Sequence, residues 1–403
     1  MKILGVIFWL CILFIIYVYA GYPLILALLA RMRRKQAGYP RVTPPLSILI
    51  AAYNEEDVIA AKLENTLSLD YPEDCRQIVV AVDGSEDGTA GIVQSFADRG
   101  VELSFDIRRG GKTAAINRAM PRLQHNIVVF SDANNLYEHD ALLELVKPFS
   151  DPKVGAVTGS KIILDESDAY AKADGLYWRY ESAIKENETL LGSCTGVVGE
   201  ILAIRRNLYQ PPPDQVINDD FFIGMSVLRQ GYRLVYAPKA HSFERGSLTE
   251  KDEAMRRSRI VAGRYQAMLM SRNVLPWRNP LLIWQILSHK FMRPLVPLMM
   301  ILAFFASTAT LIWPPQSSNY AWLFLVPPYN SIFFLLEVLV YSLAVFGGYF
   351  KNKGLLGKLL YLPTFLVNSN LSAILGLYSY FTGKQTSLWK RTRRRGDSAG
   401  QIS

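Results

Sequence analysis

The sequence predicts an α/β domain whose largely parallel sheet has helices on both faces, inserted between an N-terminal transmembrane helix and a C-terminal set of interfacial and transmembrane helices. Short β-type runs alternate with helical stretches from Pro44 to about Tyr236, which is typical of such a domain. Hydrophobic residues make up 50% of the 403 residues and gather at the two ends. Basic clusters follow the first and last apolar segments, as at the edges of membrane spans.

The first apolar segment, residues 3–30, carries no charged side chain and is long enough to cross roughly 30 Å of hydrocarbon. A cleaved signal peptide is the alternative, with Val18 and Ala20 as a passable cleavage site. The apolar run is too long for the core of a signal peptide, so we expect a retained anchor over residues 1–31. Lys2 precedes the segment, whereas four basic residues follow it: Arg31, Arg33, Arg34 and Lys35. This asymmetry predicts an outside N-terminus and a cytosolic middle domain.

The middle domain, which we assign to residues 44–245, contains four predicted strands. They cover residues 46–52, 77–82, 101–107 and 126–130. Helices are expected to follow the first two strands, one of them through Leu69 and one opening near Asp87. Ligands of parallel α/β sheets bind at the carboxyl ends of the strands, and polar motifs follow these strands.

The C-terminal part begins with a predicted amphipathic helix over residues 250–270, followed by three apolar segments. These lie at about 281–313, 321–350 and 355–381. The first holds His289, Lys290 and Arg293, so we expect its opening half in the membrane interface. We divide this part into interfacial helices (246–292), a transmembrane region (293–381) and a basic tail (382–403).

The number of crossings conflicts with the charge pattern. Four crossings that start outside also end outside, yet the tail holds six basic residues against one acidic residue and should be cytosolic. Either one segment does not cross, or the 321–350 segment contains an extra turn at Pro327-Pro328.

The net charge of +9 belongs to the two clusters at the membrane edges, which together account for all of it. A nucleic-acid-binding surface would carry its charge on the folded domain, so no nucleic-acid partner is expected. The cysteines, Cys11, Cys75 and Cys194, are scattered and indicate neither a disulfide framework nor a zinc site.

Four polar motifs follow the predicted strands. Residues 53–56 and 83–89 place carboxylates and glycines where they would suit the base and ribose of a nucleotide, although ordinary turns have similar sequences. Residues 109–112, Arg-Gly-Gly-Lys, open a helix and would offer a cation and free amide donors to a phosphate. Asp132 and Asn134 form an i, i+2 oxygen pair that can chelate a divalent ion bridging a diphosphate.

A fifth motif, Asn218-Asp219-Asp220, precedes a predicted helix. Its carboxylates either cap the helix or include a general base that accepts the proton of a sugar hydroxyl. Together the five motifs resemble the membrane-embedded branch of the family 2 glycosyltransferases, which includes cellulose, hyaluronan and poly-N-acetylglucosamine synthases and, more distantly, ceramide glucosyltransferase. The resemblance implies a GT-A fold, a nucleotide sugar donor, Mg²⁺ or Mn²⁺, and inversion at the anomeric carbon, and we expect the donor to be UDP-linked.

The resemblance also implies roles for individual residues. Asp220 is the expected base and Asp219 its support, and Asp132 with Asn134 would hold the metal. Asn134 stands where the family usually has a second acid, which puts the metal affinity in doubt. The nucleotide-sugar-binding set comprises Tyr53, Glu55, Asp83, Lys112 and Asp132.

Two further groups match the family's acceptor loop and its arginine motif. Cys194, Thr195 and Gly196 would lie near the acceptor, with Cys194 expected to pack rather than to act as a nucleophile. Ile260 replaces the family's tryptophan, which weakens the case for processive chain extension. The expected diphosphate-binding residues are Arg256, Arg257 and Arg259.

The sequence therefore predicts an integral membrane glycosyltransferase, in the bacterial inner membrane with a cytosolic catalytic domain. It would transfer a sugar from a nucleotide sugar to a growing cell-surface polysaccharide. One alternative is the transfer of a single sugar to a lipid acceptor. An alternative of another class, motivated by Asn134, is a non-catalytic export or scaffold component.

Overall fold

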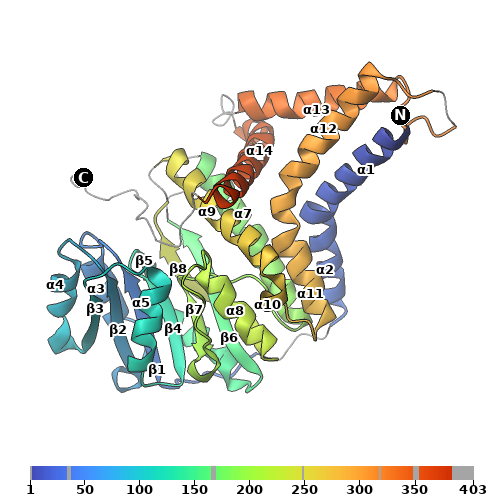
Figure 1. Cartoon of the computed structure of the whole chain (residues 1–403). Helices are drawn as coiled ribbons and strands as arrows, with labels where there is room; N and C mark the ends of the chain where they lie inside the picture. Colours follow the sequence, from blue (N-terminus) through green and yellow to red (C-terminus); the bar gives the residue numbers. More distant parts are fainter. Residues whose placement is uncertain are drawn as a thin grey trace.

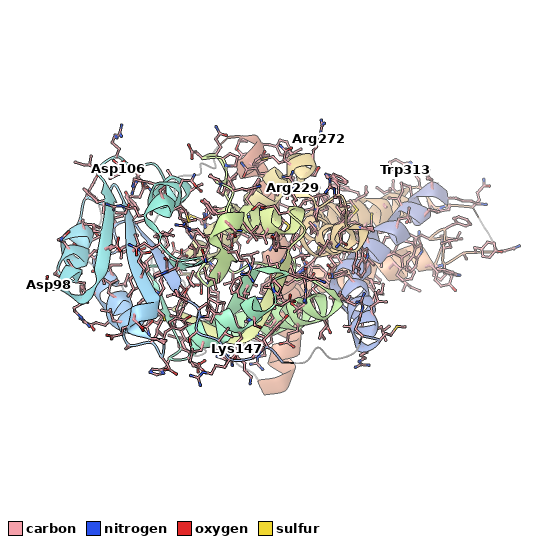
Figure 2. All side chains as sticks on the ribbon, turned by 90° about the horizontal axis from the view of Figure 1, so that it is seen from below. Asp98, Asp106, Lys147, Arg229, Arg272 and Trp313 are labelled. Atoms are coloured by element: carbon pink, nitrogen blue, oxygen red, sulfur yellow. The ribbon has the colours of Figure 1, made fainter. Side chains whose placement is uncertain are left out.

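The computed structural model describes residues 2–33, 38–164, 169–246, 249–316, 319–347 and 354–383. An eight-stranded sheet with helices on both faces forms the middle domain, and a group of long helices extends from one side of it (Figure 1). Figure 2 shows the elongated shape that results, with Asp98 near one end and Trp313 on the helices toward the other. The strand order is β3-β2-β1-β4-β7-β6-β8-β5.

The four predicted strands form the parallel half of the sheet. They are β1 (Leu46–Ala52), β2 (Arg76–Asp83), β3 (Val101–Asp106) and β4 (Ile127–Asp132). All seven residues of β1 are buried, because helices cover both faces of this central strand. Alternate residues therefore belong to different cores: Ile48 and Ile50 pack on one face and Leu49 on the other.

The other half makes the sheet mixed, whereas the sequence predicted a largely parallel one. Its strands are β5 (Asn135–Tyr137), β6 (Val154–Ile163), β7 (Leu202–Arg205) and β8 (Arg233–Glu244). β7 lies antiparallel between β4 and β6, and β5 pairs antiparallel with β8. The two antiparallel strands, β5 and β7, are only three and four residues long, so the alternation of strand and helix in the sequence did not reveal them.

Helices fill the connections of the domain. They are α3 (Ile59–Leu67), α4 (Thr89–Gln94), α5 (Lys112–Ala119), α6 (Ala141–Val146), α7 (Ala169–Leu191), α8 (Asp219–Arg229), α9 (Glu250–Leu269) and α10 (Ser271–Val274). Short 3₁₀ turns are η2 (Glu73–Cys75), η3 (Ala97–Arg99), η4 (Met120–Arg122), η5 (Lys147–Ser150) and η6 (Arg206–Leu208). The hydroxyl of Thr249 accepts a hydrogen bond from Asp252 N at 3.1 Å, which caps the start of α9.

Three helical segments of the described chain are long and apolar enough to cross a membrane. The first, Lys2–Arg31, consists of α1 (Lys2–Ile16), the π-helical turn η1 (Tyr17–Gly21) and α2 (Tyr22–Arg31). The second, Pro280–Ile312, consists of α11 (Pro280–Ile286), the π-helical turn η7 (Leu287–Phe291), η8 (Arg293–Leu295) and α12 (Val296–Ile312). The third is α13 (Tyr329–Phe346).

α1 and α12 lie side by side, joined by a buried cluster that includes Phe8, Cys11 and Ala306 (Figure 1). Large apolar side chains on the outer faces remain exposed, for example Phe305 and Leu335. A lipid bilayer would cover such faces. The second segment, Pro280–Ile312, is one candidate span. It therefore crosses the boundary between residues 292 and 293, where we expected the interfacial helices to end and the transmembrane region to begin.

The last helix, α14 (Gly354–Phe381), is not among the three candidate spans and packs against α9 (Figure 1). A Cβ atom added at Gly376 would lie 2.7 Å from the carbonyl oxygen of Ser258, so the two helices approach closely. Turns occupy residues 319–328 before α13 begins, which leaves the predicted 321–350 segment with one helix of 18 residues. The basic tail beyond residue 383, with Arg34 and Lys35, lies outside the described residues.

Candidate active site

The candidate site lies at the carboxyl ends of β1, β2 and β4, where the loops after β1 and β2 are hydrogen-bonded to each other. Asn54 follows β1 with a positive φ of 51° and accepts a hydrogen bond from Glu86 N at 3.0 Å. Glu55 N donates to the hydroxyl of Thr89 at 2.8 Å. Glu55 itself is buried, and the ring of Tyr53 stacks under the guanidinium of Arg109 at 3.9 Å.

Asp83 organises the Arg-Gly-Gly-Lys loop. Its two carboxylate oxygens accept hydrogen bonds from Gly110 N at 3.0 Å and Gly111 N at 2.6 Å. Our expectation that these amides are free for a phosphate is therefore wrong, because Asp83, 27 and 28 residues earlier, already accepts from them. The hydrogen bonds from the two glycine amides to Asp83 instead fix the loop that leads into Lys112, the first residue of α5.

Lys112 links the predicted metal motif to the predicted base. Its ammonium lies 2.6 Å from Asp132 Oδ1, and both side chains are about one-fifth exposed. Burial would lower the pKa of Lys112, but the charges of Asp132, Asp219 and Asp220 raise it above its ordinary value. The structure thus brings three of the five motifs to one place around this lysine.

Asp220 lies in the first turn of α8 and is partly exposed. Burial and the adjacent carboxylate of Asp219 raise the pKa of Asp220 to about 6, opposed by Lys112, by the amide of Phe221 and by Arg259. A carboxylate with this pKa is ionised at neutral pH and still basic enough to accept a proton.

The arginine motif on α9 separates into two parts. Arg256 and Arg257 both pair with Glu253, at 2.7 and 2.9 Å, and Arg257 Nη1 also donates to the hydroxyl of Ser369 on α14 at 2.9 Å. Burial would raise the pKa of the Glu253 carboxyl, but these arginines hold it far below its ordinary value. Arg259, in contrast, is close enough to Asp220 to lower the pKa of that carboxyl.

α9 also fixes the segment that precedes the base. Asn218 Nδ2 donates to the carbonyl oxygen of Ile260 at 2.9 Å, and Gln266 Oε1 accepts from Ile217 N at 2.9 Å. A Cβ atom at Gly263 would lie 2.4 Å from the side-chain carbon of Asn218, so only glycine fits at this contact. Ile260, which stands at the position of the family's tryptophan, therefore accepts a hydrogen bond through its backbone from Asn218, the residue before Asp219-Asp220.

The predicted acceptor loop is buried. Cys194 is 0% exposed, its thiol donates to the carbonyl oxygen of Gly196 at 3.0 Å, and burial raises its pKa to about 12. A neutral thiol is a poor nucleophile, which agrees with a packing role. Thr195 and Gly196 contact residues of α7 and of the second membrane segment.

The oxygen pair at the end of β4 suits a metal ion that a substrate completes. In the described part of the chain, no group of three or more His, Cys, Asp and Glu side chains comes together to hold a metal ion. Asp132 offers a carboxylate and Asn134 an amide oxygen, and Mg²⁺ typically binds one or two carboxylates together with substrate phosphates and water. The pair therefore fits a divalent cation that is shared with a diphosphate.

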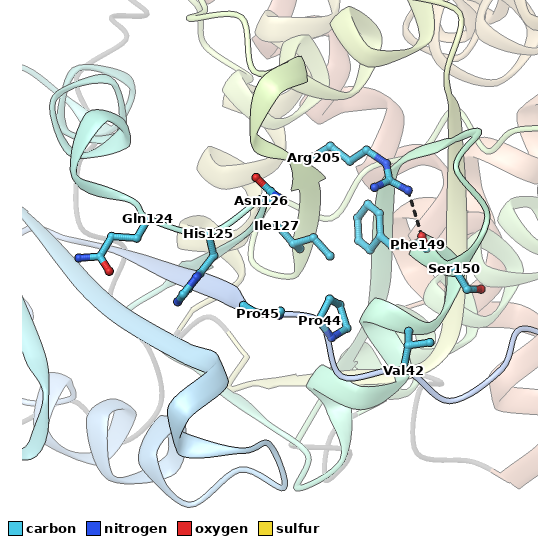
Figure 3. Close-up of a pocket in the computed structure, with 10 residues that line it drawn as sticks. All are labelled: Val42, Pro44, Pro45, Gln124, His125, Asn126, Ile127, Phe149, Ser150 and Arg205. Carbon is cyan, nitrogen blue, oxygen red and sulfur yellow. Dashed lines mark hydrogen bonds between the residues drawn. The ribbon is translucent and has the colours of Figure 1, made fainter.

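A pocket of about 440 Å³ lies at the other end of the strands, away from the candidate site (Figure 3). Pro45 precedes β1 and Asn126 precedes β4, so the pocket is at the amino ends of these strands. Arg205 lines it and donates to the carbonyl oxygen of Phe149 at 3.0 Å. None of its lining residues belongs to a predicted motif, and we do not assign it to the site.

A buried polar cluster beneath the acceptor loop was not predicted from the sequence. Glu181 and Glu188 of α7 meet His289 and Arg293 of the second membrane segment. We read the charged residues of that segment as a sign of the membrane interface. The signal that could have located the cluster is the occurrence of charged side chains inside an otherwise apolar span, where such groups require partners.

Comparisons with known proteins bear on the family and the fold of the chain. A family model described as "Glycosyltransferase like family 2" matches residues 44–261. The poly-beta-1,6-N-acetyl-D-glucosamine synthase of Staphylococcus aureus strain MSSA476 is 28% identical over 201 residues, which cover 48% of each chain. The synthase of Staphylococcus epidermidis is 27% identical with the same coverage, so the match spans about half the length of these relatives.

Among solved structures, a mannosyltransferase from Pyrobaculum calidifontis, determined with GDP-Man and Mn²⁺, has a TM-score of 0.70 to this chain. The two sequences are 22% identical, and the likeness covers 95% of this chain and 100% of the other. At that identity the likeness shows a common fold and nothing about the ligand.

Proposed function

The chain belongs to the family 2 glycosyltransferases, and we propose that it transfers a sugar from a nucleotide sugar to a growing polysaccharide, with inversion at the anomeric carbon. Its catalytic domain has the GT-A-like mixed sheet. The observation that carries the proposal is the convergence of Lys112, Asp132 and Asp220 at the carboxyl ends of the parallel strands. The resemblance to the poly-N-acetylglucosamine synthases supports a polymeric acceptor, and we propose a UDP-linked donor.

The donor would occupy the loops after β1, β2 and β4. Tyr53, Glu55 and Asp83 would bind the nucleoside, with Asp83 acting chiefly by shaping the glycine loop. Asp132 and Asn134 would hold Mg²⁺ or Mn²⁺, which neutralises the charge on the diphosphate when it is bound. Lys112 and Arg259 would contribute positive charge from the protein itself.

Asp220 would act on the acceptor. A hydroxyl oxygen of the acceptor attacks the anomeric carbon while its proton moves to the carboxylate of Asp220. The bond between that carbon and the diphosphate oxygen breaks, and the nucleoside diphosphate leaves with the electron pair. Asp219 supports this step because its charge raises the pKa of Asp220 and so makes the carboxylate more basic.

The apolar helices support a membrane location. We propose that the bacterial inner membrane holds them and that the catalytic domain, residues 44–245, faces the cytosol, where nucleotide sugars are made. The interfacial helices would cover residues 246–292 and the transmembrane region 293–381. α9 would then lie at the membrane surface, with Arg256 and Arg257 bound to Glu253 and to α14.

The test is turnover by the full chain, purified in detergent, against a panel of nucleotide sugars with Mg²⁺ or Mn²⁺. We expect release of a nucleoside diphosphate from one donor, and a loss of about 10²–10⁴-fold in Asp220→Asn, because general bases contribute that much. Asp214→Asn, an exposed residue of the loop before α8, is the matched control and should retain full activity. Release that is equal in the wild type and in Asp220→Asn would refute the assignment of the base, and no release from any donor would refute the function.

A second candidate function is the transfer of one sugar to a lipid. It is favoured by Ile260, which replaces the tryptophan of the processive enzymes, and by the small number of candidate spans in the described chain. Sizing the product separates the two functions, because a polymerase yields long glycans and a lipid transferase yields a single glycolipid.

A further inference from the structure

A buried carboxylate joins the catalytic domain to the membrane helices. Glu188, near the end of α7, is 0% exposed and accepts a hydrogen bond from the hydroxyl of Tyr22 at 2.6 Å. The same carboxylate accepts from Thr195 N at 2.7 Å and from Thr195 Oγ1 at 3.0 Å. Tyr22 belongs to the first candidate span and Thr195 to the acceptor loop, so one side chain connects the two.

The second candidate span reaches the same carboxylate. His289 Nδ1 lies 2.8 Å from Glu188 Oε1, and it must carry a proton because an ionised carboxylate only accepts. Burial would raise the pKa of Glu188, but its contact with His289 outweighs burial and lowers it, so the carboxylate is ionised at neutral pH. His289 Nε2 lies 3.1 Å from Glu181, which in turn pairs with Arg293.

Both spans are irregular at this level. η1 and η7 are π-helical turns, a conformation that is rare in proteins and frequent at functional sites. The two turns touch, since the hydroxyl of Tyr17 lies 2.7 Å from that of Ser288 and accepts from Trp284 Nε1 at 2.9 Å. Burying several charges costs desolvation energy that apolar packing would avoid, so the cluster is better explained by a positional role than by stability.

The loop that Glu188 holds continues to the predicted base. Cys194 N donates to the carbonyl oxygen of Leu234 at 2.8 Å, and Val198 N donates to the hydroxyl of Thr158 at 2.9 Å. A Cβ atom at Gly199 would lie 2.9 Å from the Cβ of Asp220, so the loop packs directly on the base. Three residues, 196–198, separate the clamped threonine from this contact.

We propose that Glu188 is a positioning residue that sets the place of the acceptor loop, and through it of the acceptor hydroxyl, relative to Asp220 and to the two membrane segments. The proposal rests on the proposed function. The donor loops are held by other contacts, chiefly those of Asp83, so the clamp acts on the acceptor and not on the donor. Attack by water on the donor needs no acceptor loop and should not depend on Glu188.

The test compares transfer to the acceptor with hydrolysis of the donor by water, in the full chain in detergent. In Glu188→Gln, the new amide offers one oxygen where the carboxylate offered two, and transfer should fall by about 10²-fold, the cost of a misplacement near 1 Å. Hydrolysis and the KM for the donor should stay within about twofold of the wild type. Tyr22→Phe removes one of the hydrogen bonds and should lower transfer by about tenfold.

The matched control is Glu186→Gln, because Glu186 lies two residues away on α7 and is exposed. It should leave both rates unchanged. Equal losses of transfer and hydrolysis in Glu188→Gln would mean that Glu188 only maintains the fold, and rates like those of the control would mean that it has no role. Either result overturns the proposal.

Hydrogen exchange measures the clamp without turnover. Peptides that cover residues 192–199 should take up deuterium faster in Glu188→Gln than in the wild type or in Glu186→Gln, because the amide of Thr195 loses its ionised acceptor. Unchanged uptake would overturn the proposal even if the wild type turned over no donor, a result that would refute the proposed function separately.

Discussion

At the residue scale, the protonation of Asp220, the proposed base, should decide at which pH the site can act. The pKa of about 6 results from burial and from Asp219, both of which disfavour the charged form. Since a protonated carboxyl accepts no proton, activity should require a pH above this value. Asp219 therefore makes the Asp220 carboxylate more basic and also raises the lowest pH at which that carboxylate is ionised.

The first prediction is a pH profile. We expect kcat/KM to be level above about pH 6 and to fall tenfold for each pH unit below it, because the pKa of Asp220 is about 6. Asp219→Asn removes a like charge, lowers the pKa of Asp220 and should move the acid limb to lower pH. Initial rates of the wild type and of Asp219→Asn between pH 4.5 and 8, with saturating metal, measure the acid limb and the level region of each profile. A profile that is the same in Asp219→Asn would contradict the coupling.

A second prediction concerns Asn134. An aspartate at this position adds a negative charge beside Asp132, and affinity for hard cations grows with ligand charge. Asn134→Asp should lower the Mg²⁺ or Mn²⁺ concentration for half-maximal activity by about tenfold, and EDTA should abolish the activity of both proteins. Titrating the metal after EDTA treatment measures this. An unchanged half-maximal concentration would show that residue 134 does not ligate the ion.

At the scale of elements, α9 supports the segment that precedes the proposed base. Its backbone at Ile260 and its side chain at Gln266 bind the segment 215–218, while its Arg259 lies near Asp220. α14 packs on the same helix through Ser369 and Gly376. A helix adjacent to the candidate membrane region thus holds the catalytic segment in place.

Gly263 tests this support. In Gly263→Ala, the added Cβ would lie 2.4 Å from Asn218, so the base segment must shift, and we expect kcat to fall by about 10–100-fold. Overpacking also costs about 1–3 kcal/mol of stability. The control is Gly91→Ala on α4, where a Cβ meets no atom within 4 Å and the change should be neutral or stabilising by about 0.5–1 kcal/mol. Kinetics and thermal unfolding of both variants measure the two effects; full activity in Gly263→Ala would show that α9 does not position the base.

At the scale of the whole molecule, the described residues hold three candidate spans, a number that would agree with the charge pattern. With the proposed orientation, three crossings that start outside would end inside, and α14, which packs on α9, would lie on the cytosolic side with it. The fourth apolar segment of the sequence is then a helix that packs on α9.

Cysteine labelling tests this arrangement. With a membrane-impermeant maleimide, Trp313→Cys, at the far end of α12, should react from outside the cell. Asp98→Cys in the catalytic domain and Thr382→Cys after α14 should react only in inverted vesicles. The reaction of Thr382→Cys from outside would show that α14 crosses the membrane.

The sequence alone determined the α/β alternation, the four parallel strands to within two residues and the order of the motifs at their ends. These features depend on local periodicity and on turn residues, which neighbouring positions encode. The sequence also located the first apolar span, because an uncharged apolar run of this length is typical of a membrane-spanning helix.

Only the tertiary structure decided which motif residues meet. Asp83 binds amides 27 and 28 residues later, and Glu188 binds His289 across 101 residues. Arg256 and Arg257 pair with Glu253, whereas Arg259 lies near Asp220, and only the packing around α9 shows this division. Such contacts depend on how elements pack rather than on any local pattern, and for that reason the clamp between the membrane helices and the acceptor loop could not be read from the sequence.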